Sequence, residues 1–179
     1  MEHILVERYF DSAQDYDSFP GLSARAPWCY EQYRLSYWGS YVSLSGDRIF
    51  CHFRAPDAES FRIPNRQHGV PFTTAWAASL QAGLASPDLE GPKGLLRLLC
   101  PTDFDRDPEA EPQPQVIVVV AGGEPVNEYP GRLLWRYRAR NNDRTVSILD
   151  NASEDAVRES SPETAEVWAA KVRSRHITA

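Results

Sequence analysis

The residues of this chain best suited to chemistry lie in two short stretches that are rich in β-forming residues. Glu7 and Tyr9 belong to ILVERYF near the start of the chain, and His52 and Arg54 belong to IFCHFRA. A carboxylate that holds an imidazole makes a proton-transfer pair, and it is also half of a metal site. We therefore take Glu7 and His52 as candidate catalytic residues. The alternative is a satisfied polar pair between packed sheets.

The elements that carry these residues can be outlined from the pattern of apolar residues. Alternation predicts strands at residues 3–10, 35–43 and 48–54, with a turn at Ser45-Gly46-Asp47 between the last two. Asp57 predicts the start of a helix that runs to about Gln67. A short helix is expected at residues 24–32, and residues 72–80 fit either a strand or a helix.

A similar order of elements is expected in the second part of the chain. Residues 115–120 predict a buried strand, and 133–140 with 144–149 predict a hairpin. Ser161-Pro162-Glu163 favours a helix start, and Ala165, Trp168, Ala169 and Val172 would then share one helical face. Residues 101–114, PTDFDRDPEAEPQP, predict an exposed acidic, proline-rich linker.

Residues 34–62 and 130–158 carry matching patterns. A shift of 96 residues places Tyr41 on Tyr137, Asp47 on Asp143, Arg48 on Arg144 and Arg62 on Arg158. This indicates an internal duplication, although a strand, turn, strand and helix can also recur by accident. We expect a first half at 1–100, the linker at 101–114 and a second, degenerate half at 115–179.

Four short motifs carry a family resemblance over about residues 3–80. LVERYF, GSYVS, FCHFRAPD and GVP, in this order, resemble an uncharacterised bacterial ferredoxin-like domain family that includes a small nickel-binding protein. The resemblance implies an α+β, ferredoxin-like fold in which two tandem halves form a pseudo-dimeric α/β barrel. It also makes nickel a possible ligand, with His52 and His68 as possible donors; Cys51 is expected in the core.

A ferredoxin-like sheet would place the strands of Glu7 and His52 side by side. One face then carries Ile4, Val6, Ile49 and Phe53, which should pack under helices. The opposite face would carry the candidate catalytic pair. The expected ligand-binding residues on that open face are Tyr9, Tyr41, Phe50 and Arg54.

Composition limits the classes of function. A net charge of −6 over 179 residues argues against broad nucleic-acid binding, and three scattered cysteines without a CxxC pair predict neither a zinc knuckle nor a disulfide framework. The first residues do not resemble a signal peptide, and no apolar run is long enough to cross a membrane. We expect a cytoplasmic protein without membrane partners. His3 is expected to be solvated.

The sequence favours a small-molecule-binding protein with a pocket on the open sheet face. Five tryptophans and eight tyrosines could line such a pocket, or could fill a core. One alternative is a cofactor-independent enzyme that uses Glu7 and His52 for proton transfer on a small organic substrate. The other is a protein that binds nickel or another transition metal. No cofactor is predicted from the residues themselves, the expected partner is a small molecule, and a homo-oligomer is possible.

Overall fold

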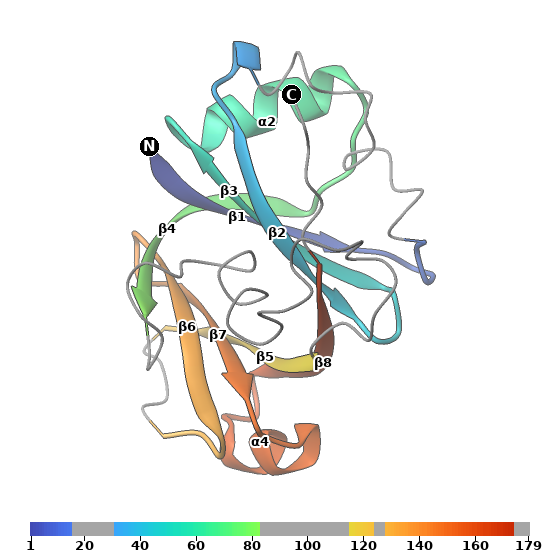
Figure 1. The fold of residues 1–179 in the computed structure, drawn as a ribbon, viewed down its shortest axis with the longest axis vertical. Coiled ribbons are helices and arrows are strands. Elements are labelled where there is room, and N and C mark those ends of the chain that lie inside the picture. Colours follow the sequence, from blue (N-terminus) through green and yellow to red (C-terminus); the bar gives the residue numbers. More distant parts are fainter. Residues whose placement is uncertain (16–30, 83–114, 124–127, 174–179) are drawn as a thin grey trace, which may run out of the picture.

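A computed structural model describes residues 1–15, 31–82, 115–123 and 128–173, and the strands within them close into one barrel (Figure 1). Neighbouring strands around the barrel are antiparallel, in the order β1-β3-β2-β8-β5-β7-β6-β4. In chain order the elements are β1 (Glu2–Tyr9), β2 (Ser36–Ser43), β3 (Arg48–Ala55), α2 (Ala58–Gln67), β4 (Thr74–Ala82), β5 (Gln115–Gly122), β6 (Arg132–Ala139), β7 (Arg144–Asp150), α4 (Glu154–Ser160) and β8 (Glu166–Arg173).

The predicted fold class is therefore wrong. The described chain is mostly antiparallel strand with two short helices, and it is a closed β-barrel instead of an α+β, ferredoxin-like α/β barrel. Local patterns located strands and hairpins, but they carry no information on which sheet edges meet. Here the edge strand β2 pairs with β8, and β4 pairs with β6, so no edge among the eight strands stays unpaired.

The pairing register of strands β1–β4 repeats in strands β5–β8. Leu5 pairs with His52 and Trp76, and Val118 pairs with Ile148 and Trp168 in the same way. Shifts of 113, 96 and 92 residues thus carry β1 onto β5, β2–β3 onto β6–β7, and β4 onto β8. The shift in register within β2 next to Gly39 also recurs in β6 next to Trp135. We call residues related by these shifts mates.

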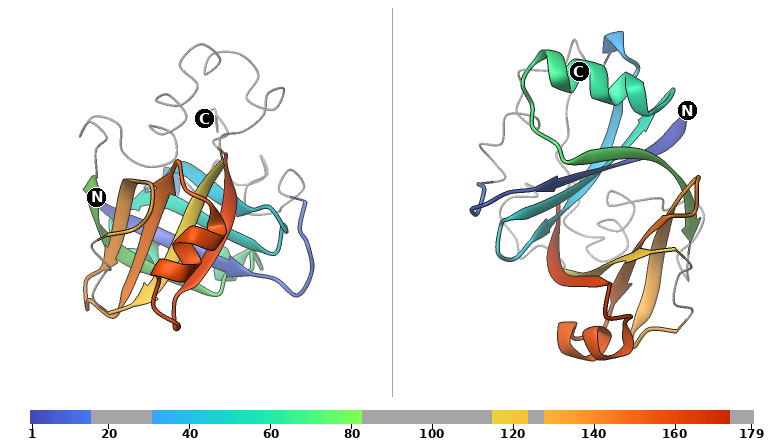
Figure 2. Two further views of the ribbon diagram at one scale, coloured as in Figure 1. Left: turned by 90° about the horizontal axis from the view of Figure 1, so that it is seen from below. Right: turned by 180° about the vertical axis from the view of Figure 1, so that it is seen from behind.

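The barrel has an inner core and one helix against each outer side. α2 lies over β1–β4 and α4 lies against β5–β8, as the views in Figures 1 and 2 show from several sides. Phe61 of α2 packs at 4.9 Å from Phe53, measured between ring centroids, and Val157 of α4 is fully buried. Burial of side chains of this size stabilises each contact by about 1.5–3 kcal/mol.

Both hairpins turn through a residue with positive φ at the same position of the repeat. Gly46 has φ +74°, and its mate Asn142 has φ +58°. Glycine and asparagine tolerate this left-handed backbone best, which explains why the two turns form there. In the first turn the Asp47 carboxylate also accepts hydrogen bonds from Ser43 and Ser45 at 2.9 and 2.5 Å.

The helix predicted after Ser161 is also wrong, because residues 166–173 form strand β8. Their spacing fits a helix, but it also alternates, with Trp168 and Val172 in the inner core and Val167 against α4. Pairing with β5 settles the choice, and α4 starts instead at its N-cap Ser153. Residues 72–80, which fitted either element, lie mainly in β4.

Several predictions cannot be compared with the described part of the chain. The linker at 101–114 lies outside it, as does nearly all of the helix expected at 24–32. The division into two halves stays a prediction, although strands from both sides of the linker contribute to one barrel. None of the helices in the described segments is both long enough and apolar enough to span a bilayer.

Candidate functional site

Strand alternation sorts the side chains of β1 and β3 onto two faces. Val6 and Cys51 belong to the cluster beneath α2, whereas Leu5 and Phe50 belong to the inner core of the barrel. Glu7 and His52 have the inner parity and are both fully buried. The face that we expected to be open is thus the inside of a closed barrel.

The Glu7 carboxylate is held by donors from two other strands, β4 and β7, and from β1 itself. Oε1 accepts hydrogen bonds from Trp76 Nε1 and Arg144 Nε, each at 2.6 Å. Oε2 accepts from Arg144 Nη2 and from the Tyr9 hydroxyl. A two-point contact with a guanidinium is the strongest common arrangement for a carboxylate, so the Glu7 side chain is held firmly in a polar cluster.

His52 belongs to a separate chain of hydrogen bonds that leads into the barrel. Its Nε2 lies 2.9 Å from His3 Nδ1, and its Nδ1 lies 3.3 Å from the Tyr137 hydroxyl. The Tyr137 hydroxyl lies 3.0 Å from that of Tyr41. The ring of Trp38 packs against His52 at 5.5 Å. The hydrogen bonds of this chain can run from His3 to Tyr41 or from Tyr41 to His3. The two arrangements differ in which nitrogen of each imidazole carries the proton.

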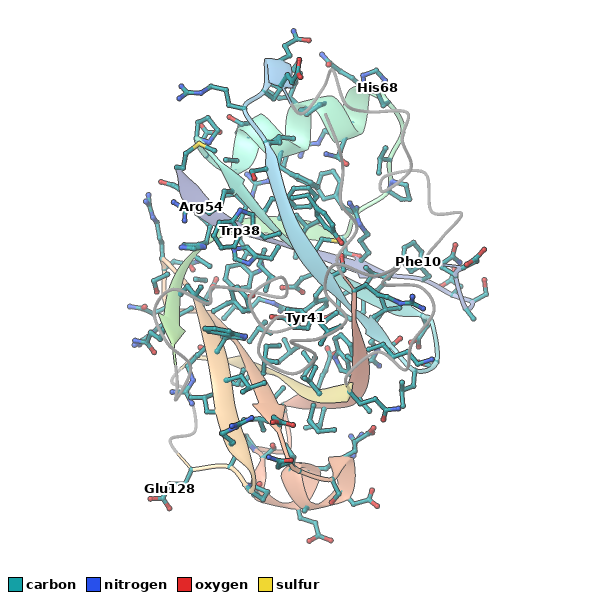
Figure 3. The ribbon with its side chains drawn as sticks, in the orientation of Figure 1. Phe10, Trp38, Tyr41, Arg54, His68 and Glu128 are labelled. Atoms are coloured by element: carbon teal, nitrogen blue, oxygen red, sulfur yellow. The ribbon has the colours of Figure 1, made fainter. Side chains whose placement is uncertain are left out.

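Tyr41 and Tyr137 are mates, and their hydroxyl groups contact each other. Both side chains are fully buried, and Figure 3 shows Tyr41 between the two layers of strands. Burial, followed by the neighbouring Tyr137, raises the pKa of the Tyr41 phenol well above its usual value. Tyr41 therefore stays protonated and donates or accepts a hydrogen bond as a neutral group.

Burial sets the charge of His52 as well. Desolvation, followed by the electrostatic influence of His3 and Arg54, lowers the pKa of His52 well below its usual value. His52 is thus neutral near pH 7. Burial, with the Glu7 carboxylate next in importance, raises the pKa of the Tyr9 phenol. Both groups keep their neutral forms, which lowers the cost of burying them.

The structure does not join Glu7 to His52. Glu7 stands opposite Phe50 and His52 stands opposite Leu5, so the two are diagonal neighbours on adjacent strands. Every hydrogen bond recorded for either side chain goes to other residues, within the described part of the chain. Their catalytic role stays a prediction.

The expected ligand-binding residues have mostly structural contacts. Phe50 packs against Trp168 at 5.1 Å and against Tyr9 at 5.8 Å, inside the inner core. Arg54 lies over the Trp38 ring at 5.6 Å, near one end of the barrel in Figure 3. Tyr41 is bound to Tyr137. Tyr41 and Phe50 belong to the inner core, and Arg54 is partly exposed. A ligand-binding role for these residues stays a prediction.

The possible metal donors lie apart. His68 follows α2 outside the barrel, whereas His52 points to the inside, and Figure 3 places His68 far from Trp38 and Arg54. No group of three metal-binding side chains occurs among the described residues. Cys51 is a buried free thiol that accepts a hydrogen bond from Ser40 at 3.0 Å. Nickel binding stays a prediction from the resemblance.

A cleft of about 490 Å³ opens where β8 leaves β2. β2 pairs with β8 only from Ala170 to Arg173, so the first residues of β8 diverge from the turn between β2 and β3. The apolar lining of the cleft includes Trp168 and Val167. Its polar lining comprises Ser45, Asp47, Arg48, Glu154, Arg158 and Glu166.

Most polar residues of the cleft are paired with one another. Arg48 contacts Glu166 at 3.1 Å, and Arg158 contacts Glu154 at 2.6 Å. Glu154 also accepts a hydrogen bond from the backbone of Ala169. The exception is Trp168, whose buried indole Nε1 has no hydrogen-bond partner in the described structure.

Sequence reasoning missed several residues of these clusters. His3 was expected to be solvated, but it is partly buried and bonds to His52. Arg144 and Trp76 lie 137 and 69 residues from Glu7, and no local pattern links them. The one available signal was the match of Tyr41 with Tyr137 under the shift of 96 residues, because equivalent residues of a repeat can contact each other where the two copies face.

Comparison with known proteins adds no identity. No protein-family model, curated protein or solved structure matches this chain.

Proposed function

We propose that this protein binds a small organic molecule in the cleft between β8 and the turn that joins β2 to β3. The observation that carries the proposal is the cleft itself. Its volume of about 490 Å³ falls within the range of small-molecule sites, which is roughly 300–1,000 Å³. The proposed pocket lies at a junction of strands and differs in place from the open sheet face that the sequence favoured.

The lining supports a ligand with both an apolar and a polar part. Trp168 and Leu44 offer apolar surface, while Arg48 and Arg158 offer charged donors at the rim. An apolar floor with a few placed polar groups is the usual composition of such sites. Leu44 is half exposed, which is unusual for a large apolar side chain and fits a surface that a ligand covers.

A fluorescent probe can test the proposal. We expect 1-anilinonaphthalene-8-sulfonate to bind the wild-type protein saturably with one site. Ala165 lines the cleft, so Ala165→Trp should fill it and weaken probe binding at least tenfold. Ile63→Trp adds the same indole at an exposed position on α2, outside the cleft lining, and should leave binding unchanged.

Two results would contradict the proposal. One is the absence of saturable binding to the wild-type protein. The other is equal binding by Ala165→Trp and wild type, once far-ultraviolet circular dichroism shows that both are folded.

A further inference from the structure

The strand junction at the cleft has an equivalent junction on the other side of the barrel, and the two differ in one side chain that matters for binding. The shifts that relate the two halves carry Glu7 onto Val120 and Tyr9 onto Gly122. They also carry Trp76 onto Trp168. The mate of Arg144 is Arg48. Both junctions thus bring together a tryptophan and an arginine, from β4 and β7 in one case and from β8 and β3 in the other.

At the first junction the two donors share a carboxylate. Glu7 takes a hydrogen bond from the Trp76 indole at 2.6 Å and a two-point contact from the Arg144 guanidinium. The Glu7 side chain is fully buried, and Arg144 keeps about a third of its side chain exposed. A tryptophan indole and an arginine guanidinium therefore already bind one carboxylate within this same molecule.

At the second junction the donors remain, but the position equivalent to Glu7 carries no carboxylate, and Arg48 contacts Glu166 of β8 instead. Val120 and Gly122 replace Glu7 and Tyr9, so both the acid and the neighbouring phenol are lost. Trp168 is only 5% exposed, and its buried indole N–H has no hydrogen-bond partner in the described structure. A buried donor without an acceptor destabilises the folded protein, and a bound acceptor would remove that penalty.

We infer that the cleft binds the carboxylate group of a small organic acid through Arg48 and the Trp168 indole, in the way that Arg144 and Trp76 bind Glu7. This inference rests on the proposed function and names the class of its ligand. The body of the acid would lie along the apolar lining of the cleft.

Glu166 competes for the same guanidinium, and the competition is weak. It contacts Arg48 through one oxygen at 3.1 Å, and the side chains of Glu166 and Arg48 are 48% and 32% exposed. Exposed ion pairs of this kind contribute little to stability, because solvent screens them. A ligand that gains a two-point contact with Arg48 and an indole hydrogen bond gains more than the displaced pair contributes. Asp47 and Glu154 keep their own hydrogen bonds.

The test compares two probes that differ in charge and share one shape, 2-naphthoate and 2-naphthamide, by isothermal titration calorimetry at low salt. The wild-type protein should bind naphthoate at least tenfold more tightly than naphthamide. Trp168→Phe removes the N–H and keeps an aromatic ring, so it should reduce this preference about tenfold. Trp38→Phe is the same exchange remote from the cleft, and it should keep the preference.

Glu166→Gln gives the test a second, opposite direction. It removes the competing carboxylate and one negative charge from the lining, so naphthoate should bind more tightly than to the wild type. A merely damaged cleft would show weaker binding of both probes. The inference is overturned if naphthamide binds as tightly as naphthoate, or if Trp168→Phe leaves the preference intact.

The outcomes separate this inference from the proposed function. If Ala165→Trp blocks the anilinonaphthalene probe but both naphthyl probes bind wild type equally, the cleft is a binding site without a preference for carboxylates. If none of the three probes binds, the proposed function fails and the inference fails with it.

Discussion

Single residues in the interior of this barrel are polar where their mates are apolar. His52 has Ile148 as its mate, and Glu7 has Val120. The polar member of each pair lies in the first part of the chain and is fully buried. Each is hydrogen-bonded from the opposite side of the barrel, by Tyr137 of β6 and Arg144 of β7 respectively. Each polar cluster therefore joins strands β1–β4 to strands β5–β8, because its hydrogen-bond partners come from both sets of strands.

The buried imidazole of His52 makes stability depend on pH. Its folded pKa lies well below its value of about 6.5 in an unfolded chain, first because of burial. Below about pH 6.5 the unfolded chain takes up a proton that the folded chain refuses, so the free energy of unfolding falls as pH falls. The expected slope from His52 is up to about 1.4 kcal/mol per pH unit.

Chemical denaturation between pH 5 and 8 would measure this slope. His52→Gln should flatten it relative to wild type, whereas His68→Gln, at the exposed end of α2, should keep it. An unchanged slope in His52→Gln would contradict the assignment.

At the scale of elements, the hairpins and helices of the two halves are built in parallel ways. Asp57 and Ser153 cap α2 and α4 and accept a hydrogen bond from the backbone three residues on. Arg62 reaches from α2 to the Ala75 carbonyl of β4, and Arg158 reaches from α4 to the Val167 carbonyl of β8 at 2.7 Å. The same local contacts hold each helix against its sheet.

The two hairpin turns should respond differently to exchange of their central residues. Asn142 is exposed with φ +58°, so Asn142→Gly relieves left-handed strain and should raise stability by about 0.5 kcal/mol. Gly46 lies beneath residues 13 and 14, and a Cβ there would approach Ala13 Cβ at 3.2 Å and the Gln14 carbonyl oxygen at 3.3 Å. Gly46→Asn should thus destabilise by about 1–3 kcal/mol. Thermal unfolding of both variants checks the pair, and equal shifts would contradict the difference in packing.

At the scale of the whole molecule, closure of the barrel makes strands β1–β4 and strands β5–β8 depend on each other. The inner core takes side chains from all eight described strands, including Leu5, Tyr41, Leu134 and Trp168. Separation of β2 from β8, or of β4 from β6, would expose this core and leave strand edges unpaired. The barrel is therefore expected to unfold as one unit.

Core truncations on the two sides of the barrel should therefore act on one transition. Leu5→Ala in β1 and Ile148→Ala in β7 each remove a fully buried side chain and should cost about 2–5 kcal/mol. Guanidinium unfolding followed by circular dichroism and tryptophan fluorescence should give coincident curves for both variants. Two separate transitions, only one of which moves with each variant, would show that the halves fold independently.

Local patterns were enough to find many elements and wrong for others. The strands of Glu7 and His52, the turn at Gly46 and the helix after Asp57 lie where the sequence indicated. The expected helix after Ser161 is strand β8, since spacing that suits a helix also suits alternation there. The faces of β1 were also predictable, because alternation separates Val6 from Leu5 without knowledge of the partner strands.

The sequence by itself determined which side chains of each strand share a face and where the chain turns, because these depend on neighbours within a few residues. Only the tertiary structure decided that both inner faces close into one barrel, that Glu7 meets Arg144 and not His52, and that the Trp168 indole is left without an acceptor. These facts depend on contacts between strands far apart in the chain, and hydrogen bonds between such strands leave no local signal in the order of residues.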